Sequence, residues 1–196
     1  LATELMRRTL PLLLLCSSLL ASAPVLAQKF IPPSPDLIAL VKKAAADNTS
    51  FKDKYDAQVW LMTMSNRLSP TIPDPGKRLV LLKLIHEEAT RAGVSPELVL
   101  SIINVESNFD RFAVSHAGAR GLMQIMPFWL KLSGQPDGNL FHETTNLRLG
   151  CTILKYYLGK SHGDIREALQ RYNGATVGID YSDRVLKALS RKWSWD

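Results

Sequence analysis

The helical spacing of apolar residues is the feature that most constrains the fold. Apolar side chains recur every three or four residues in nearly every segment. One such stripe comprises Leu147, Cys151, Leu154 and Leu158. No segment shows the strict apolar–polar alternation of a half-buried strand. The chain is therefore predicted to be all-α.

Local signals place the ends of the predicted helices. Ser95 is suited to cap a helix that starts at Pro96, and Gly93 is suited to end the helix before it. The stretch "SPTIPDPG", residues 69–76, holds three prolines and a glycine and reads as a linker. Helices are predicted over residues 35–47, 55–68, 77–92, 96–107, 121–126, 146–158, 164–172 and 181–190.

The first 27 residues have the pattern of a secretory signal peptide. "MRR" at 6–8 precedes a Leu-rich stretch and a small-residue end at Ala27, where cleavage is expected. A membrane anchor or lipid attachment at Cys16 are the alternatives. The predicted organisation is a signal peptide at 1–27, a helical extension with a Pro-rich linker at 28–75, and a main domain at 76–196. After cleavage no stable membrane insertion is expected.

Charge and cysteine content limit the possible binding partners and the role of Cys151. The chain has 24 basic and 18 acidic residues, a net charge of +6, which suits an anionic polymer. It lacks a Lys/Arg run of nucleic-acid-binding density, so no nucleic-acid partner is expected. Without residues 1–27, Cys151 is left alone and forms no internal disulfide. Its helical stripe predicts core packing.

Glu106 is the residue whose chemistry needs an explanation. It follows Val99, Ile102 and Ile103 at helical spacing, so it lies on an apolar stripe. Removal of a carboxylate from water raises its pKa, and a carboxyl that stays protonated serves as a general acid. The alternative is a glutamate exposed at the helix end; spacing alone leaves both open.

The segments after Glu106 carry a family resemblance. Glu106-Ser107-x-Phe109 leads into Ala113-x-Ser115, and then into the run 118–124, "GARGLMQ". With Asn146 and Tyr172-Asn173-Gly174, this series resembles the motifs of the soluble lytic transglycosylases, lysozyme-like bacterial enzymes that cut peptidoglycan. The resemblance covers about residues 80–190 and leaves out the extension. It implies a lysozyme-like, all-α catalytic domain.

The resemblance implies a mechanism with one acid/base. Glu106 would protonate the glycosidic oxygen between N-acetylmuramic acid and N-acetylglucosamine, then accept the proton of the muramyl C6 hydroxyl as it closes on C1. The product would be a 1,6-anhydromuramyl end, and no cofactor is needed. Hydrolytic glycosidases usually need two carboxylates. Asp110, Glu143 and Asp164 are interpreted as turn or helix-start residues.

The resemblance also implies substrate-binding roles, each with a plainer alternative. Ser115 would bond the carboxyl or the substrate, or be a turn serine. Met123 and Gln124 would line the cleft, or be core and surface residues. Tyr172 would face Glu106 with its hydroxyl, or be an ordinary core tyrosine, and Arg171 before it should point outward. The predicted substrate-binding set is Ser115, Met123, Gln124, Asn146, Tyr172 and Asn173.

Metal chemistry is not expected. "HEEATR" at 86–91 begins like a zinc-protease motif but lacks the second histidine, and the other histidines have no paired ligand spacing. The tryptophans Trp129, Trp193 and Trp195 suit sugar stacking or packing. The sequence thus predicts a periplasmic enzyme acting on peptidoglycan strands. A hydrolytic goose-type muramidase, a catalytically idle glycan-binding scaffold and an enzyme dedicated to a secretion or pilus apparatus are the alternatives.

Overall fold

A computed structural model describes residues 50–51, 53–174 and 179–195. Helices dominate this part of the chain, and its only β pairing consists of isolated bridges at Val114, Arg120 and Ile125. The all-α prediction is confirmed. The elements are α2 (Lys54–Leu68), α3 (Pro75–Ala92), α4 (Pro96–Glu106), α5 (Phe128–Leu132), α6 (Glu143–Lys160), α7 (Ile165–Asn173), α8 (Ile179–Ala188) and the π-helical turn η1 (Leu189–Trp193).

Most helix ends follow the local signals in the sequence. Ser95 Oγ accepts a hydrogen bond from Leu98 N–H over 3.2 Å, with Pro96 at the first helical position, as predicted. Gly93 ends α3 with φ of 69°. α3 starts at Pro75, inside the predicted linker, because Asp74 accepts from Lys77 N–H at 3.0 Å and acts as its N-cap.

The helix predicted over residues 121–126 is wrong. Arg120 and Ile125 exchange main-chain hydrogen bonds of 3.0 Å in both directions, which closes a tight loop there. Gln124 takes a positive φ of 50° within it. The short helix forms later, as α5. Hydrogen bonds within the loop, and between the loop and α6, thus outweigh the helical tendency of the apolar run "LMQIM".

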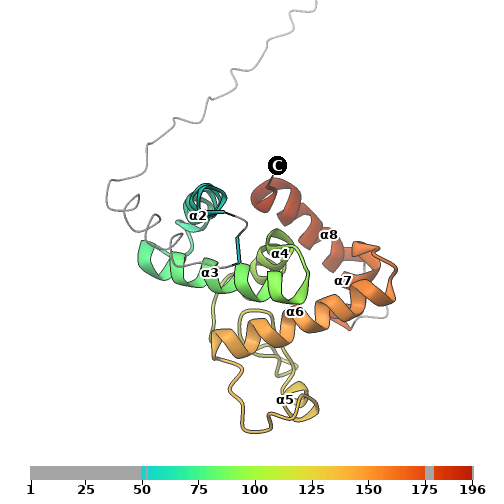
Figure 1. Cartoon of the computed structure of the whole chain (residues 1–196). Coiled ribbons are helices and arrows are strands. Elements are labelled where there is room, and N and C mark those ends of the chain that lie inside the picture. Colours follow the sequence, from blue (N-terminus) through green and yellow to red (C-terminus); the bar gives the residue numbers. More distant parts are fainter. Residues whose placement is uncertain (1–49, 52, 175–178, 196) are drawn as a thin grey trace, which may run out of the picture. The chain divides into compact units, whose positions relative to one another are not determined.

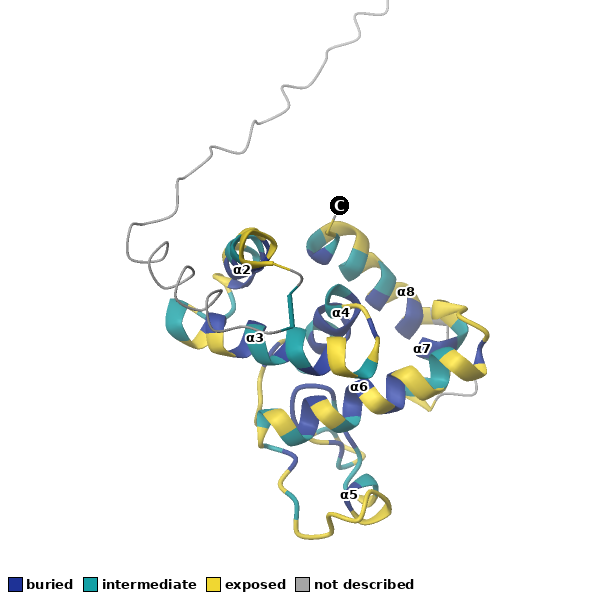
Figure 2. Cartoon of the chain, in the orientation of Figure 1, coloured by how far each residue is buried: buried dark blue, intermediate teal, exposed yellow. Residues whose placement is uncertain are grey.

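The core forms around α4, which lies between the other helices (Figure 1). Its Leu100, Ile102 and Ile103 are fully buried, and most of the helix is buried in Figure 2. It packs against α3, α8 and η1. Cys151 on α6 is also buried, and burial raises the pKa of its thiol to about 12, which confirms the predicted core role.

Residues 50–51 and 53–75 of the predicted extension are described, and α2 is the helix that lies wholly within them. Its Trp60, Leu61 and Met64 are buried in the same apolar cluster as α3 and α4. The signal peptide and the predicted helix at 35–47 lie outside the described residues. Within the described part of the chain, every helix is too short or too polar to serve as a membrane span.

Candidate active site

Glu106 is the last residue of α4, and the chain turns sharply after it. Ser107 N–H still bonds to the Ile103 carbonyl at 3.0 Å, while Asn108 and Phe109 both take positive φ, 47° and 67°. Left-handed backbone is uncommon for residues with a Cβ and needs support from the surroundings. Phe109 is buried against Trp193, with ring centroids 5.4 Å apart, and this packing holds the turn.

The carboxyl of Glu106 is half-buried and faces α8. Burial is the largest influence and raises the pKa of Glu106 above its ordinary value. The hydroxyl of Tyr181 donates to Glu106 Oε1 over 2.7 Å, and this hydrogen bond and the nearby Arg184 oppose the increase. Because burial outweighs both, the protonated form is favoured relative to a glutamate in water.

Tyr181 is the functional candidate that the sequence reasoning missed. Its side chain is buried, and burial together with the charge of Glu106 raises the pKa of Tyr181 well above 10, so it stays a hydrogen-bond donor. Tyr181 and Val185 are buried four residues apart on α8. This spacing was visible in the sequence and shows an inward face, although not which side chain the hydroxyl meets.

The hydroxyl of Tyr172 is hydrogen-bonded to the loop and not to Glu106. Its hydroxyl donates to the main-chain carbonyl of Met123 over 2.9 Å, and the hydroxyl bonded to Glu106 belongs to Tyr181. The packing of α7 against α6 places the Tyr172 ring beside the loop that contains Met123, and α6 supports the same loop. Burial and then the charge of Glu106 raise the pKa of Tyr172, so Tyr172 still lies near the carboxyl.

Asn146 on α6 ties the 120–123 loop into the core. This buried side chain accepts from Met123 N–H at 2.8 Å and donates to the carbonyls of Arg120 and Leu140 at 2.8 and 2.9 Å. Gly121, with φ of 74°, passes so close that a Cβ there would clash with Asn146 Nδ2 and the Leu140 carbonyl. The loop that reaches Tyr172 is therefore held by side-chain hydrogen bonds.

Three of the other predicted substrate-binding residues, Met123, Gln124 and Ser115, belong to the loop structure. Met123 is fully buried, and Gln124 Nε2 donates to the carbonyls of Ala113 and Gly121 at 3.2 and 2.9 Å. Ser115 Oγ accepts from Ala119 N–H at 3.1 Å within a turn. Asn173 is exposed at the end of α7. Their contacts with a substrate stay predictions.

The competing carboxylates have the structural contacts predicted for them. Asp110 accepts from Phe112 N–H at 2.9 Å, and Asp164 caps α7 through Glu167 N–H at 3.1 Å. Glu143 starts α6 and lies 3.7 Å from Arg111. Within residues 50–51, 53–174 and 179–195, no group of three or more His, Cys, Asp or Glu side chains is placed to hold a metal ion.

Comparison with known proteins identifies the family. Residues 83–184, more than half of the chain, match the model of the transglycosylase SLT domain. The chain belongs to this family, and its all-α fold is a lysozyme-like transglycosylase fold.

Curated relatives give the same picture. A Histophilus somni protein named membrane-bound lytic murein transglycosylase C is 34% identical over 122 residues, covering 53% of this chain and 34% of that protein. A protein of the same name from Yersinia pestis is 36% identical over 114 residues, covering 50% of this chain and 32% of that protein. One from Haemophilus ducreyi is 42% identical over 73 residues, covering 33% of this chain and 20% of that protein. The chain spans about a third or less of these relatives' length.

Proposed function

We propose that this protein is a peptidoglycan lytic transglycosylase, in which Glu106 is the single acid/base. It cleaves the β-1,4 bond between N-acetylmuramic acid and N-acetylglucosamine and leaves 1,6-anhydromuramyl ends. The observation that carries the proposal is the Glu106 carboxyl, with its pKa raised by burial and one oxygen bonded to Tyr181. Family membership and the names of the relatives support the substrate class.

The two oxygens of Glu106 have different roles in this mechanism. Oε1 accepts the Tyr181 hydroxyl hydrogen, so Oε2 carries the proton toward the sugar. Transfer of that proton to the glycosidic oxygen accompanies cleavage of its bond to C1. The muramyl C6 hydroxyl then attacks C1 and returns its proton to Glu106. Atoms and protons balance without water, and ring closure within one sugar has a proximity advantage.

The opposing influences on the Glu106 pKa suit both halves of this cycle. Burial keeps the carboxyl protonated before the bond breaks, as a general acid must be. Once the proton has left, the Tyr181 hydrogen bond and the positive charge of Arg184 stabilise the carboxylate. The regenerated base is therefore held beside Tyr181 until the C6 hydroxyl returns a proton.

Product masses test the proposal. Purified sacculi are digested with the wild-type protein and with Glu106→Gln, which keeps the side-chain shape but cannot donate a carboxylic proton. The proposal expects fragments whose muramyl ends weigh one water less than reducing ends, from the wild type alone. Reducing ends would instead support a hydrolytic muramidase, and an unchanged phenotype of Glu106→Gln in cells would support a non-catalytic scaffold.

We also propose that the protein acts in the periplasm after export. The predicted signal peptide supports this location. The alternative is lipid attachment at Cys16, which is compatible with the word "membrane-bound" in the names of the relatives. Mass analysis of the mature N-terminus separates the two, because cleavage after Ala27 gives a chain starting at Gln28, whereas lipid attachment gives a modified Cys16 at the N-terminus.

A further inference from the structure

A pocket lies beside the start of α4, at the opposite end of this helix from Glu106. We call it the aromatic pocket; it has a volume of about 440 Å³, within the usual range for small-molecule sites. Its described lining residues come from α2, α3, the start of α4, and the segments on either end of the described chain: Ser50, Phe51, Asp56, Trp60, His86, Thr90, Pro96, Glu97 and Trp195.

Stacked rings form one wall of the aromatic pocket. Phe51 and His86 stack with centroids 3.5 Å apart, and Trp60 meets the His86 ring edge-on at 4.9 Å. Ser50 Oγ lies 2.7 Å from His86 Nδ1 and fixes the imidazole plane. Trp195 is 41% exposed, so much of its indole is open to solvent. The pocket therefore combines a rigid aromatic wall with one accessible indole.

Carboxylates supply the formal charge of the aromatic pocket. Its lining includes Asp56 and Glu97, and none of the described residues that line it is Lys or Arg. Burial lowers the pKa of His86 to about 4, although Glu97 opposes this, so the imidazole is neutral at neutral pH. Glu97 is fixed by Trp60 Nε1–H at 2.7 Å and Ser95 Oγ–H at 2.6 Å. In a chain with a net charge of +6, the described lining of this pocket is therefore acidic.

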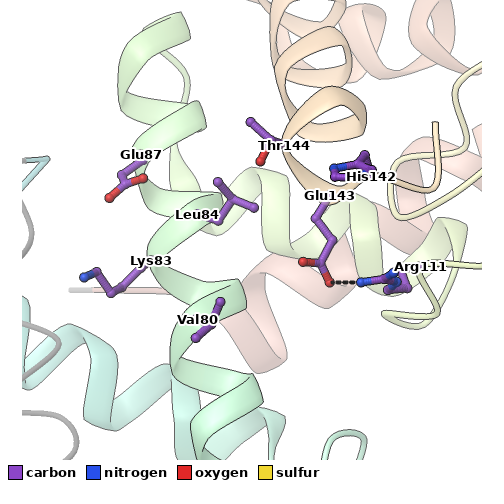
Figure 3. A pocket seen from close by; sticks show the side chains of 8 residues that line it. All are labelled: Val80, Lys83, Leu84, Glu87, Arg111, His142, Glu143 and Thr144. Atoms are coloured by element: carbon purple, nitrogen blue, oxygen red, sulfur yellow. Dashed lines mark ion pairs between the residues drawn. The ribbon is translucent and has the colours of Figure 1, made fainter. Parts of the chain in front are cut away.

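A different hollow, lined by residues of α3 and the start of α6, has charged residues of both signs in its lining. That hollow, about 510 Å³ in volume, has Lys83 and Arg111 as well as Glu87 and Glu143 in its lining. Figure 3 shows Arg111 pointing at Glu143, with which it forms an ion pair of 3.7 Å. Its acidic and basic groups offset each other, whereas the charged residues in the described lining of the aromatic pocket are Asp56 and Glu97, both acidic.

We propose that the aromatic pocket binds an alkylammonium group, such as the side chain of a lysine or another diamino acid. An ammonium is attracted both to the faces of aromatic rings and to carboxylates, and its methylene chain packs against apolar walls. Asp56, exposed in the lining, and Glu97 provide the carboxylates, and Trp195 provides the open ring face. A neutral sugar can donate hydroxyl hydrogen bonds to the same carboxylates, but it brings no positive charge to offset theirs.

The aromatic pocket is separate from the candidate active site. Glu97 and Glu106 belong to the same helix and lie about 14 Å apart along its axis, at a rise of about 1.5 Å per residue. The inference therefore goes beyond the proposed reaction and does not depend on it. It assigns ligand recognition to the part of the chain where α2 packs on the transglycosylase domain.

Binding measurements on the full chain test the inference. Nα-acetyl-lysine amide is titrated by calorimetry, with Nα-acetyl-norleucine amide as the uncharged analogue and an N-acetylglucosamine oligomer as the sugar. We expect saturable binding of the lysine probe and at least about tenfold weaker binding of the other two. Trp195→Ala and Asp56→Asn should each weaken lysine binding about fivefold, the effect of losing one cation–π or ionic contact.

Matched controls separate site effects from general ones. Phe128→Ala and Asp137→Asn remove an exposed aromatic ring and an exposed carboxylate elsewhere and should leave the affinity unchanged. Thermal melting checks the fold of each variant, and Asp56 is exposed, so its substitution tests the site even if Trp195→Ala unfolds. Equal binding of the norleucine analogue, preferred binding of the sugar, or unchanged affinity in Asp56→Asn would overturn the inference.

Discussion

Tyr181 on α8 donates its hydroxyl hydrogen to Glu106 Oε1 at the end of α4, across 2.7 Å. The two residues are 75 positions apart in the sequence, so the contact depends on how α8 docks against α4. A hydrogen bond to the charged form of a carboxyl lowers its pKa. This contact therefore tempers the increase that burial causes and sets how readily Glu106 gives up its proton.

The first prediction concerns Tyr181→Phe. Loss of the hydroxyl removes an influence that lowers the pKa of Glu106, so this pKa should rise further. Activity that needs protonated Glu106 should then persist to higher pH, while the maximal rate falls about 10- to 100-fold because the carboxylate loses a charge-assisted hydrogen bond. The pH profile of kcat/KM measures both effects. Tyr172→Phe is the matched control, and an equal shift of its alkaline limb would contradict the assignment.

The second prediction concerns the stability of Glu106→Gln. With a folded-state pKa above the unfolded one, wild-type Glu106 costs stability as pH rises past the unfolded value, because the unfolded chain ionises first. The neutral amide has no such loss. Glu106→Gln should therefore gain stability relative to the wild type between about pH 4 and pH 7. Urea unfolding at both pH values measures this, and a pH-independent difference would refute the burial argument.

The third prediction concerns Gly121→Ala. The added Cβ clashes with Asn146 Nδ2 and the Leu140 carbonyl, and φ is left-handed as well. Gly118→Ala is the matched control, because Gly118 also has a positive φ of 86° but nothing within 4 Å of the added carbon. We expect Gly118→Ala to lose about 1 kcal/mol of unfolding free energy and Gly121→Ala about 3 kcal/mol or more. Chemical denaturation gives both values. Similar losses of unfolding free energy in the two variants would show that the loop relaxes to accommodate the added Cβ, against this prediction.

The fourth prediction concerns Glu88, which joins α3 to α6. Its buried carboxylate lies 2.6 Å from both Arg91 Nε and Arg148 Nη2. Burial is the largest single influence and raises the pKa of Glu88, but hydrogen bonds and charges from Arg148 and Arg91 together lower it below its ordinary value. Because both arginines are about half exposed, Glu88→Gln should cost only about 1–2 kcal/mol at pH 7.

The pH dependence of the Glu88→Gln effect checks its origin. A lowered folded-state pKa gives stability that is present above the unfolded pKa and lost as pH falls through the folded pKa. The difference between wild type and variant should therefore shrink as the pH falls below the ordinary range of a glutamate. Calorimetric melting across pH 3 to 7 measures it, and a constant difference would point to packing instead of charge.

The sequence predicted the features that depend on local chemistry. Ser95 with Pro96 marks the start of α4, and Gly93 ends α3, because caps act within a few residues. The placement of Glu106 on an apolar stripe anticipated its burial. Residues 121–126 were misread because the loop is held by Asn146, a partner more than 20 residues away.

Sequence spacing also could not tell which of two tyrosines bonds to Glu106. Tyr172 and Tyr181 both lie on inward helix faces, and periodicity says nothing about which hydroxyl meets a given carboxyl. Only the packing of α7 on α6 and of α8 on α4 decides it. The aromatic pocket escaped prediction for the same reason, since Phe51, His86 and Trp195 come from three distant segments.

The main chain of Met123 couples two helices. Its N–H is held by Asn146 of α6, and its carbonyl is held by Tyr172 of α7. Any displacement that pulls α6 and α7 apart must break one of these bonds, and each broken bond leaves a polar group without its partner. We therefore expect α6 and α7 to move together as one unit in any rearrangement of the domain, because moving one without the other would break one of these two hydrogen bonds.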